Sequence, residues 1–280
     1  MSARKPDASG FASIMAHLDL GPWAEARGRL AASLADEFGA RLIGVAAEQL
    51  IAPIYSDGLP NVAEEVTDEE RLRASGDLAA AKRAFEAAAG GRNDVEWRSA
   101  FAHPERFLIE QARAADLIVV GRWATYDERD PNLGVSPAAV AMECGRPILV
   151  IPPEKDYLAA RTIVVAWKDT REARRAVRDA LPFLKRAHEV HVVAVTSAPS
   201  DEGAEDVCAW LAGHGVNCRP SIRAGETTSI ADELSDLSVE MGADLIVSGA
   251  YGHSRMREWF FGGATRDLLE TSRACLLMSH

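Results

Sequence analysis

Blocks of apolar residues alternate along this chain with stretches of helical periodicity, so the pattern predicts strands followed by helices. The apolar blocks are short and carry no regular polar positions, which is typical of parallel strands buried on both faces. The first half of the chain predicts strands at 11–16, 41–47, 95–100, 116–121 and 147–151. It predicts helices at 23–38, 64–89 and 104–114, and a short helix before the last strand.

The same order of elements starts again near residue 161. Strands are predicted at 162–167, 190–195, 216–223, 244–247 and 274–278, and helices at 171–186, 202–213 and 228–241, with one more before the last strand. Two segments recur at nearly the same offset along the chain. ADLIVVG at 115–121 returns as ADLIVSG at 243–249, and GRPILVI at 145–151 is matched by SRACLLM at 272–278. We therefore predict two copies of one α/β domain, residues 1–154 and 155–280.

A glycine-rich stretch in the second copy, residues 243–270, carries the best indication of a ligand site. Its strand ends at Ser248 and Gly249, Gly252 follows, and Gly262 and Gly263 then open a helix. Glycines allow a close approach to the backbone, and the free N–H groups of a helix start favour anions. Ligands of parallel sheets also bind beyond the carboxyl ends of the strands. Position and chemistry together predict a phosphate site, against the alternative of a glycine turn that only lets the loop pack.

The glycine spacing identifies a resemblance. G-x2-G-x9-G-G-x-T, from Gly249 to Thr265, closely resembles the G-x2-G-x9-G-[S/T] nucleotide loop of the universal stress protein family. The duplicated layout is similar to the tandem two-domain members of that family. The resemblance implies two Rossmann-like, adenine nucleotide alpha hydrolase-like domains, each with a mostly parallel five-stranded sheet and helices on both faces. It also implies ATP or AMP as ligand, a role in stress response, and pairing of the two last strands, which makes an internal pseudo-dimer.

The binding residues implied by the resemblance lie in the second domain. They are Val195, Gly249, Tyr251, Gly252, Gly262, Gly263, Ala264 and Thr265, with Lys168 at the end of the first strand. Two positions depart from the family pattern. Lys168 stands where an Asp is expected near the ribose, and Gly263 replaces a Ser or Thr. Because an ammonium group only donates hydrogen bonds, the ribose contact of the family pattern is either lost at Lys168 or re-made toward a phosphate.

The first domain has lost most of this loop. It reads Gly121-Arg122-Trp123-Ala124, so the second glycine is missing. A Cβ at Ala124 and the Arg-Trp pair would crowd a phosphate, and we expect no nucleotide there. Asp19, at the end of the first strand, is interpreted as a turn or helix-capping residue.

The composition of the chain indicates which classes of binding partner it disfavours. The net charge of -11 and the pI near 5.2 argue against nucleic acid or an anionic membrane surface. The chain has no apolar run long enough to span a membrane and no signal peptide, so we expect a cytoplasmic protein. The four cysteines are scattered and are interpreted as structural thiols. His188 and His191 are spaced three apart but have no evident third ligand, so no metal site is predicted.

Three further features are given structural interpretations. Four arginines at helical spacing, Arg171, Arg174, Arg175 and Arg178, are interpreted as a solvated helix face, with an acidic partner or phosphates as the alternative. The aromatic run at 259–261 is assigned to the core or a domain interface rather than to a cover over the site. Ser248 and His253 flank the loop without a third member of a catalytic triad.

These observations favour a non-catalytic stress-response module with an ATP or AMP site in the second domain only, and Mg²⁺ accompanying ATP. The alternatives are an interaction scaffold that binds no nucleotide and, less favoured, a slow ATPase. The full chain can also form a homodimer.

Overall fold

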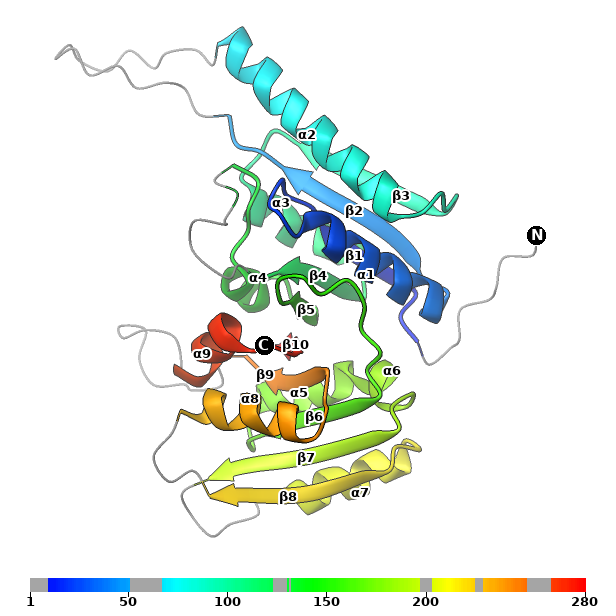
Figure 1. The fold of residues 1–280 in the computed structure, drawn as a ribbon, viewed down its shortest axis with the longest axis vertical. Coiled ribbons are helices and arrows are strands. Elements are labelled where there is room, and N and C mark those ends of the chain that lie inside the picture. The colour runs from blue at the N-terminus through cyan, green and yellow to red at the C-terminus, as the bar shows by residue number, and fades with distance from the viewer. Residues whose placement is uncertain are drawn as a thin grey trace, which may run out of the picture.

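A computed structural model of the chain describes residues 10–50, 67–122, 130, 132–196, 203–224, 229–250 and 263–280. Its centre is one ten-stranded sheet in the order β3-β2-β1-β4-β5-β10-β9-β6-β7-β8. We call β1–β5 the first half and β6–β10 the second half. Figure 1 shows the two halves one above the other, with β5 and β10 where they meet.

Each half contains five parallel strands, as the apolar runs predict. The first half contains β1 Ser13–His17, β2 Arg41–Ala47, β3 Val95–Ala100, β4 Leu117–Gly121 and β5 Ile148–Ile151. The second half contains β6 Thr162–Trp167, β7 Glu189–Thr196, β8 Cys218–Ala224, β9 Leu245–Gly249 and β10 Cys275–Ser279. The helices are α1 Ala24–Phe38, α2 Asp68–Ala88, α3 Pro104–Gln111, α4 Pro137–Glu143, α5 Arg171–Asp179, α6 Leu181–Leu184, α7 Ala204–Gly213, α8 Ile230–Glu240 and α9 Gly263–Thr271.

The two halves join through their last strands. β5 and β10 pair antiparallel, with Leu149 opposite Leu277. This confirms the predicted contact between the terminal strands, and it fuses two parallel sheets into one. The predicted boundary between residues 154 and 155 falls in the connection from β5 to β6 and stays a prediction.

Helices cover both faces of the sheet because its strands present apolar side chains on both sides. α1, α2, α5, α6 and α7 share one buried apolar cluster. The cluster on the other face contains side chains of α3, α4, α8 and α9. The first cluster crosses between the halves, where Phe183 packs against Phe11 and Phe38 with ring centroids 5.4 and 5.3 Å apart.

Two helices differ from their predicted bounds in ways that have a local cause in the sequence. The helix predicted at 171–186 is divided into α5 and α6 next to Pro182, which lacks the N–H that a continuous helix would need. The helix predicted at 64–89 starts at Asp68, where the hydroxyl of Thr67 caps it by accepting a hydrogen bond from the N–H of Glu70. Within the described ranges, no helix is both long and apolar enough to cross a membrane.

Candidate functional site

The carboxyl ends of three neighbouring strands bring three predicted binding residues together. β6 lies between β9 and β7, and the chain order reverses there. Lys168 directly follows β6, Val195 lies near the end of β7, and Gly249 ends β9. The parallel registers of β6 with β7 and with β9 set these ends side by side. This is the point of an open α/β sheet where ligands bind.

Gly249 is required by packing. A Cβ on Gly249 would lie 2.5 Å from the backbone N of Ala173 and 2.8 Å from the carbonyl carbon of Glu172. Both atoms belong to the first turn of α5, whose start is capped by the hydroxyl of Thr170. A side chain on Gly249 would therefore push α5 away from β9. Packing against α5 therefore accounts for a glycine at this position, whether or not a ligand also binds there.

The other predicted residues lie at or before the start of α9. Gly263 and Ala264 are its first residues, and Thr265 is buried in its first turn. Several residues of the loop lie outside the described part of the chain: Tyr251, Gly252, His253, the aromatic run at 259–261, and Gly262. The predicted set of binding residues therefore stays a prediction.

Strand register defines which positions of the two halves are equivalent. Ile14 pairs with Leu117 in the first half, and Ile163 pairs with Leu245 in the second. Because Leu117 and Leu245 occupy the same place in the repeated ADLIV segment, Ile14 corresponds to Ile163. Counting forward equally from Ile14 and from Ile163, Asp19 corresponds to Lys168 and Arg27 corresponds to Ala176.

In the first half, the equivalent edge is filled by Arg27. This arginine comes from α1, and its guanidinium occupies the place where a Cβ on Gly121 would lie. Its Nη2 pairs with Asp19 Oδ1 at 2.8 Å, and its Nε donates to the carbonyl of His17 at 2.8 Å. Arg27 and Asp19 are each 4% exposed, so the ion pair is buried. The side chain closes the space above the carboxyl end of β4.

Burial and charge set the protonation states at this edge. Desolvation opposes ionisation of Asp19, but the Arg27 guanidinium, together with His17 and the N–H of Gly21, outweighs it and holds the pKa of Asp19 below its usual range. Asp19 also accepts a hydrogen bond from the N–H of Gly21, which confirms its predicted turn role. The predicted capping role is wrong, because Trp23 is the N-cap of α1. Burial lowers the pKa of His17 to about 4, so its ring is neutral near pH 7.

Two further carboxylates lie at this edge. Asp130 accepts hydrogen bonds from the backbone N–H groups of Leu20 and Leu133 at 2.8 and 3.0 Å, which tie its segment to the β1–α1 connection. Glu48 follows β2 and is fully buried, with Arg73 Nη2 2.7 Å from its Oε1. Desolvation raises the pKa of Glu48, and its ion pair with Arg73 only partly offsets that effect. Buried acids leave little room or favourable potential for a phosphate.

The equivalent positions in the second half are less buried. Asp19 and Gly121 are buried, whereas Lys168 is exposed and Gly249 is half-buried. The same contrast separates His17 and Ala47, which are buried, from their equivalents Ala166 and Val195, which are half-buried. Ala176, in place of Arg27, packs into the core and reaches nothing at the strand ends. Two copies of one architecture thus differ at the edge where ligands bind.

Solved structures with the same architecture span nearly the whole chain. A universal stress protein from Archaeoglobus fulgidus DSM 4304 is 14% identical, with a TM-score of 0.67 and 95% of each chain covered. A functionally unknown protein from Pseudomonas aeruginosa PAO1 is 16% identical, with a TM-score of 0.57, 96% of this chain covered and 92% of that one. This is the tandem universal stress protein fold. No protein-family model and no curated protein matches the chain.

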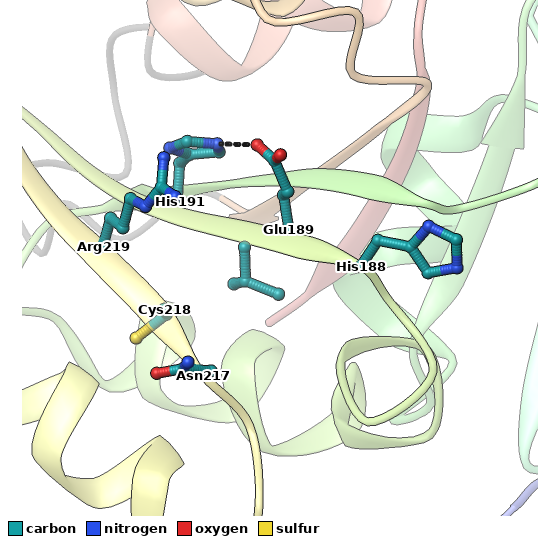
Figure 2. Close-up of a pocket in the computed structure, with 7 residues that line it drawn as sticks. His188, Glu189, His191, Asn217, Cys218 and Arg219 are labelled. Atoms are coloured by element: carbon teal, nitrogen blue, oxygen red, sulfur yellow. Dashed lines mark hydrogen bonds and ion pairs between the residues drawn. The ribbon is translucent and has the colours of Figure 1, made fainter.

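A pocket in this structure lies away from the carboxyl ends of the strands. It measures about 120 Å³ and lies at the amino ends of β7 and β8. Figure 2 shows His191 directed at Glu189, with 3.4 Å between Nε2 and Oε2, while the ring of His188 points away from them. In the described ranges, no three His, Cys, Asp or Glu residues are grouped as metal ligands would be.

Two of the four cysteines are not the free thiols that the sequence analysis predicts. Cys208 of α7 and Cys218 of β8 form a disulfide, with 5.7 Å between their Cα atoms, so the prediction of structural thiols is wrong for this pair. Ten residues of sequence separate them without any motif that would have revealed the pairing. Cys144 and Cys275 are free thiols, and burial raises the pKa of Cys275 to about 12.

The arginine-rich helix matches its interpretation as a solvated face. The four arginines of α5 are exposed, while Ala173, Ala176 and Val177 are buried on the opposite side. Arg174 pairs with Asp169, and Arg175 donates to the carbonyl of His280. The helix is amphipathic, as the spacing predicts.

Proposed function

We propose that this protein is a non-catalytic, stress-response regulatory module that binds one adenine nucleotide, ATP or AMP, at the carboxyl edge of its second half. The observation that carries the proposal is the difference between the halves. The first half closes this edge with a buried arginine, whereas in the second half Lys168 is exposed and Gly249 is half-buried, and the sequence continues from Gly249 through a glycine-rich stretch to α9. The tandem universal stress protein fold and the glycine spacing support an adenine nucleotide as the ligand.

In this proposal, each part of the site has a distinct role. The N–H groups at the start of α9 and in the loop before it hold the phosphates, helped by the positive end of the helix dipole. Lys168, exposed at the end of β6, donates to a phosphate oxygen rather than to ribose. Val195 borders the adenine. Mg²⁺ accompanies ATP through the phosphates.

The proposal is tested by looking for the nucleotide itself. Purified protein is denatured and the supernatant is chromatographed for released adenine nucleotide, and ATP and AMP are then titrated by calorimetry. We expect one site per chain. Gly252→Glu should abolish binding, because its carboxylate repels phosphate. Ala124→Glu, the equivalent change in the first half, is the matched control and should leave affinity unchanged. Equal loss in both variants would contradict the assignment to the second half.

Lys168 separates two versions of the site. If it contacts phosphate, Lys168→Asp weakens ATP binding about tenfold or more, because attraction becomes repulsion. A gain in affinity would instead assign the position to ribose, as in the family pattern.

An interaction scaffold without nucleotide is the second candidate, and Lys168 in place of the expected acid favours it. The scaffold function is supported if the denatured protein releases no adenine nucleotide and calorimetry detects no binding at millimolar ATP. If ATP binds, ADP production that requires a metal and exceeds a protein-free blank would identify a slow ATPase instead.

A further inference from the structure

Arg122 connects the closed edge of the first half to a helix of the second half. It directly follows β4, and its N–H donates to the carbonyl of Ile151 at 2.8 Å. Its guanidinium then crosses between the halves. Nη1 donates to the carbonyl of Glu270, and Nη2 donates to that of Ser272 at 3.0 Å. Arg122 thus holds two carbonyls at the carboxyl end of α9.

The end of α9 needs such a donor. The last carbonyls of a helix have no partner within it, and the negative end of the helix dipole favours a cation. The last turn of α9 carries no basic residue of its own. The cation is therefore supplied by the other half of the molecule.

The same helix bears the proposed phosphate-binding start. α9 runs only from Gly263 to Thr271, about 13 Å at the usual rise per residue, so its two ends move together. Along its length, Asp267 accepts a hydrogen bond from the hydroxyl of Ser229 at 3.1 Å. A shift at the end held by Arg122 is consequently passed to the amides at its start.

We propose that Arg122 is a positioning residue for the nucleotide site of the second half. By holding the end of α9, it fixes the direction in which the first N–H groups of α9 point. This inference rests on the proposed function. In this view Arg122, at the edge that Arg27 closes in the first half, supports the ligand-binding helix of the second half.

A second arginine contact between the halves provides the control. Arg186, just beyond α6, donates to the carbonyl of Glu37 at 2.8 Å and lies 4.8 Å over the ring of Phe38. It links the halves as Arg122 does, but it does not touch α9. If Arg122 acted only by holding the halves together, loss of Arg186 would have the same effect.

The experiment compares Arg122→Ala, Arg122→Lys and Arg186→Ala in the full chain. Hydrogen exchange of the amides of α9 is measured without ligand, and ATP affinity is measured by calorimetry. We expect Arg122→Ala to speed exchange in α9 and to weaken ATP binding about two- to tenfold. Arg122→Lys should restore part of both, because an ammonium can reach one carbonyl but lacks the guanidinium fork. Arg186→Ala should change neither.

The outcomes distinguish this inference from the proposed function. If the wild-type protein binds no nucleotide, the proposed function fails and the inference falls with it. If the wild-type protein binds ATP and Arg122→Ala binds it equally well, only the inference falls. It is also overturned if Arg186→Ala matches Arg122→Ala, or if exchange in α9 does not change.

Discussion

Replacing Arg27 with Met tests whether the first half is closed by a buried charge pair. The substitution keeps most of the side-chain volume and removes the guanidinium. Asp19 then remains 4% exposed without its cation, and the carbonyl of His17 loses a donor. Breaking a buried ion pair by removing one partner costs about 3–5 kcal/mol, because the remaining charge stays desolvated. We expect Arg27→Met to lose stability of this order near pH 7.

A second ion pair on the same helix provides the control. Arg29 pairs with Glu25 at 2.6 Å, but the two side chains are 44% and 62% exposed. Exposed pairs contribute about 0–1 kcal/mol, so Arg29→Met should cost about 1 kcal/mol at most. The two variants differ in burial rather than in the type of residue lost.

The loss should depend on pH in a defined direction. In the native protein, Arg27 lowers the pKa of Asp19 below its unfolded value, so this contribution is present above the unfolded pKa and lost as pH falls through the folded one. In Arg27→Met, burial without the guanidinium raises the pKa of Asp19 instead. The variant then relieves its penalty by protonating Asp19. The difference in stability between wild type and variant should therefore shrink as pH falls.

The assay is urea unfolding followed by circular dichroism, at neutral pH and near pH 4.5. Asp19→Asn combined with Arg27→Met removes both charges and should recover much of the loss. A cost for Arg27→Met as small as that of Arg29→Met, or a cost independent of pH, would refute the reasoning.

Three further predictions concern His17, the disulfide and Gly249. His17→Gln should flatten the loss of stability between about pH 6.5 and 4, which urea titration measures, because the native ring takes up its proton only near its lowered pKa. Cys208→Ser, or reduction of the disulfide, should lower the free energy of unfolding by about 2–3 kcal/mol, because the unfolded chain is no longer constrained by a short closed loop. Thermal unfolding measures the loss, with Cys144→Ser as the control. Gly249→Ala should destabilise the second half by about 1–3 kcal/mol, because its methyl group meets the backbone N of Ala173; an unchanged midpoint would contradict that packing.

The strands and their order could be predicted because buried parallel strands are apolar on both faces. The apolar runs at 116–121 and 244–247 form β4 and β9, and the sequence repeat then implies that the neighbouring strands are arranged alike in both halves. Pairing of β5 with β10 came from family resemblance rather than from the residues. The division of α5 from α6 had a local signal in Pro182, but helical periodicity on both sides of it hid the break.

The closure of the first half was missed although the sequence carries a signal for it. Arg27 falls within the apolar stripe of α1, between the buried residues Ala24 and Leu30. A charge in such a stripe indicates either a helix turned away from the core or a buried partner. The sequence does not distinguish these two cases, because the distances between segments decide between them. Arg27 reaches Asp19 only because of the path that the chain takes from β1 into α1. The Cys208–Cys218 disulfide was missed for the same reason.

Stability alone does not account for Arg27 and Asp19. A buried ion pair is often no better than a well-packed apolar pair, because desolvation offsets the attraction between the charges. In the second half, the equivalent helix α5 packs on its strands with Ala176 in the place of Arg27, and an alanine side chain cannot form an ion pair. The pair is therefore unnecessary for the architecture, and what it changes is access to the strand ends. Together with Arg122, which leaves the same edge and donates to the carbonyl of Ser272 beyond α9, it gives the first half a structural role, and this supports our proposal that the ligand binds in the second half.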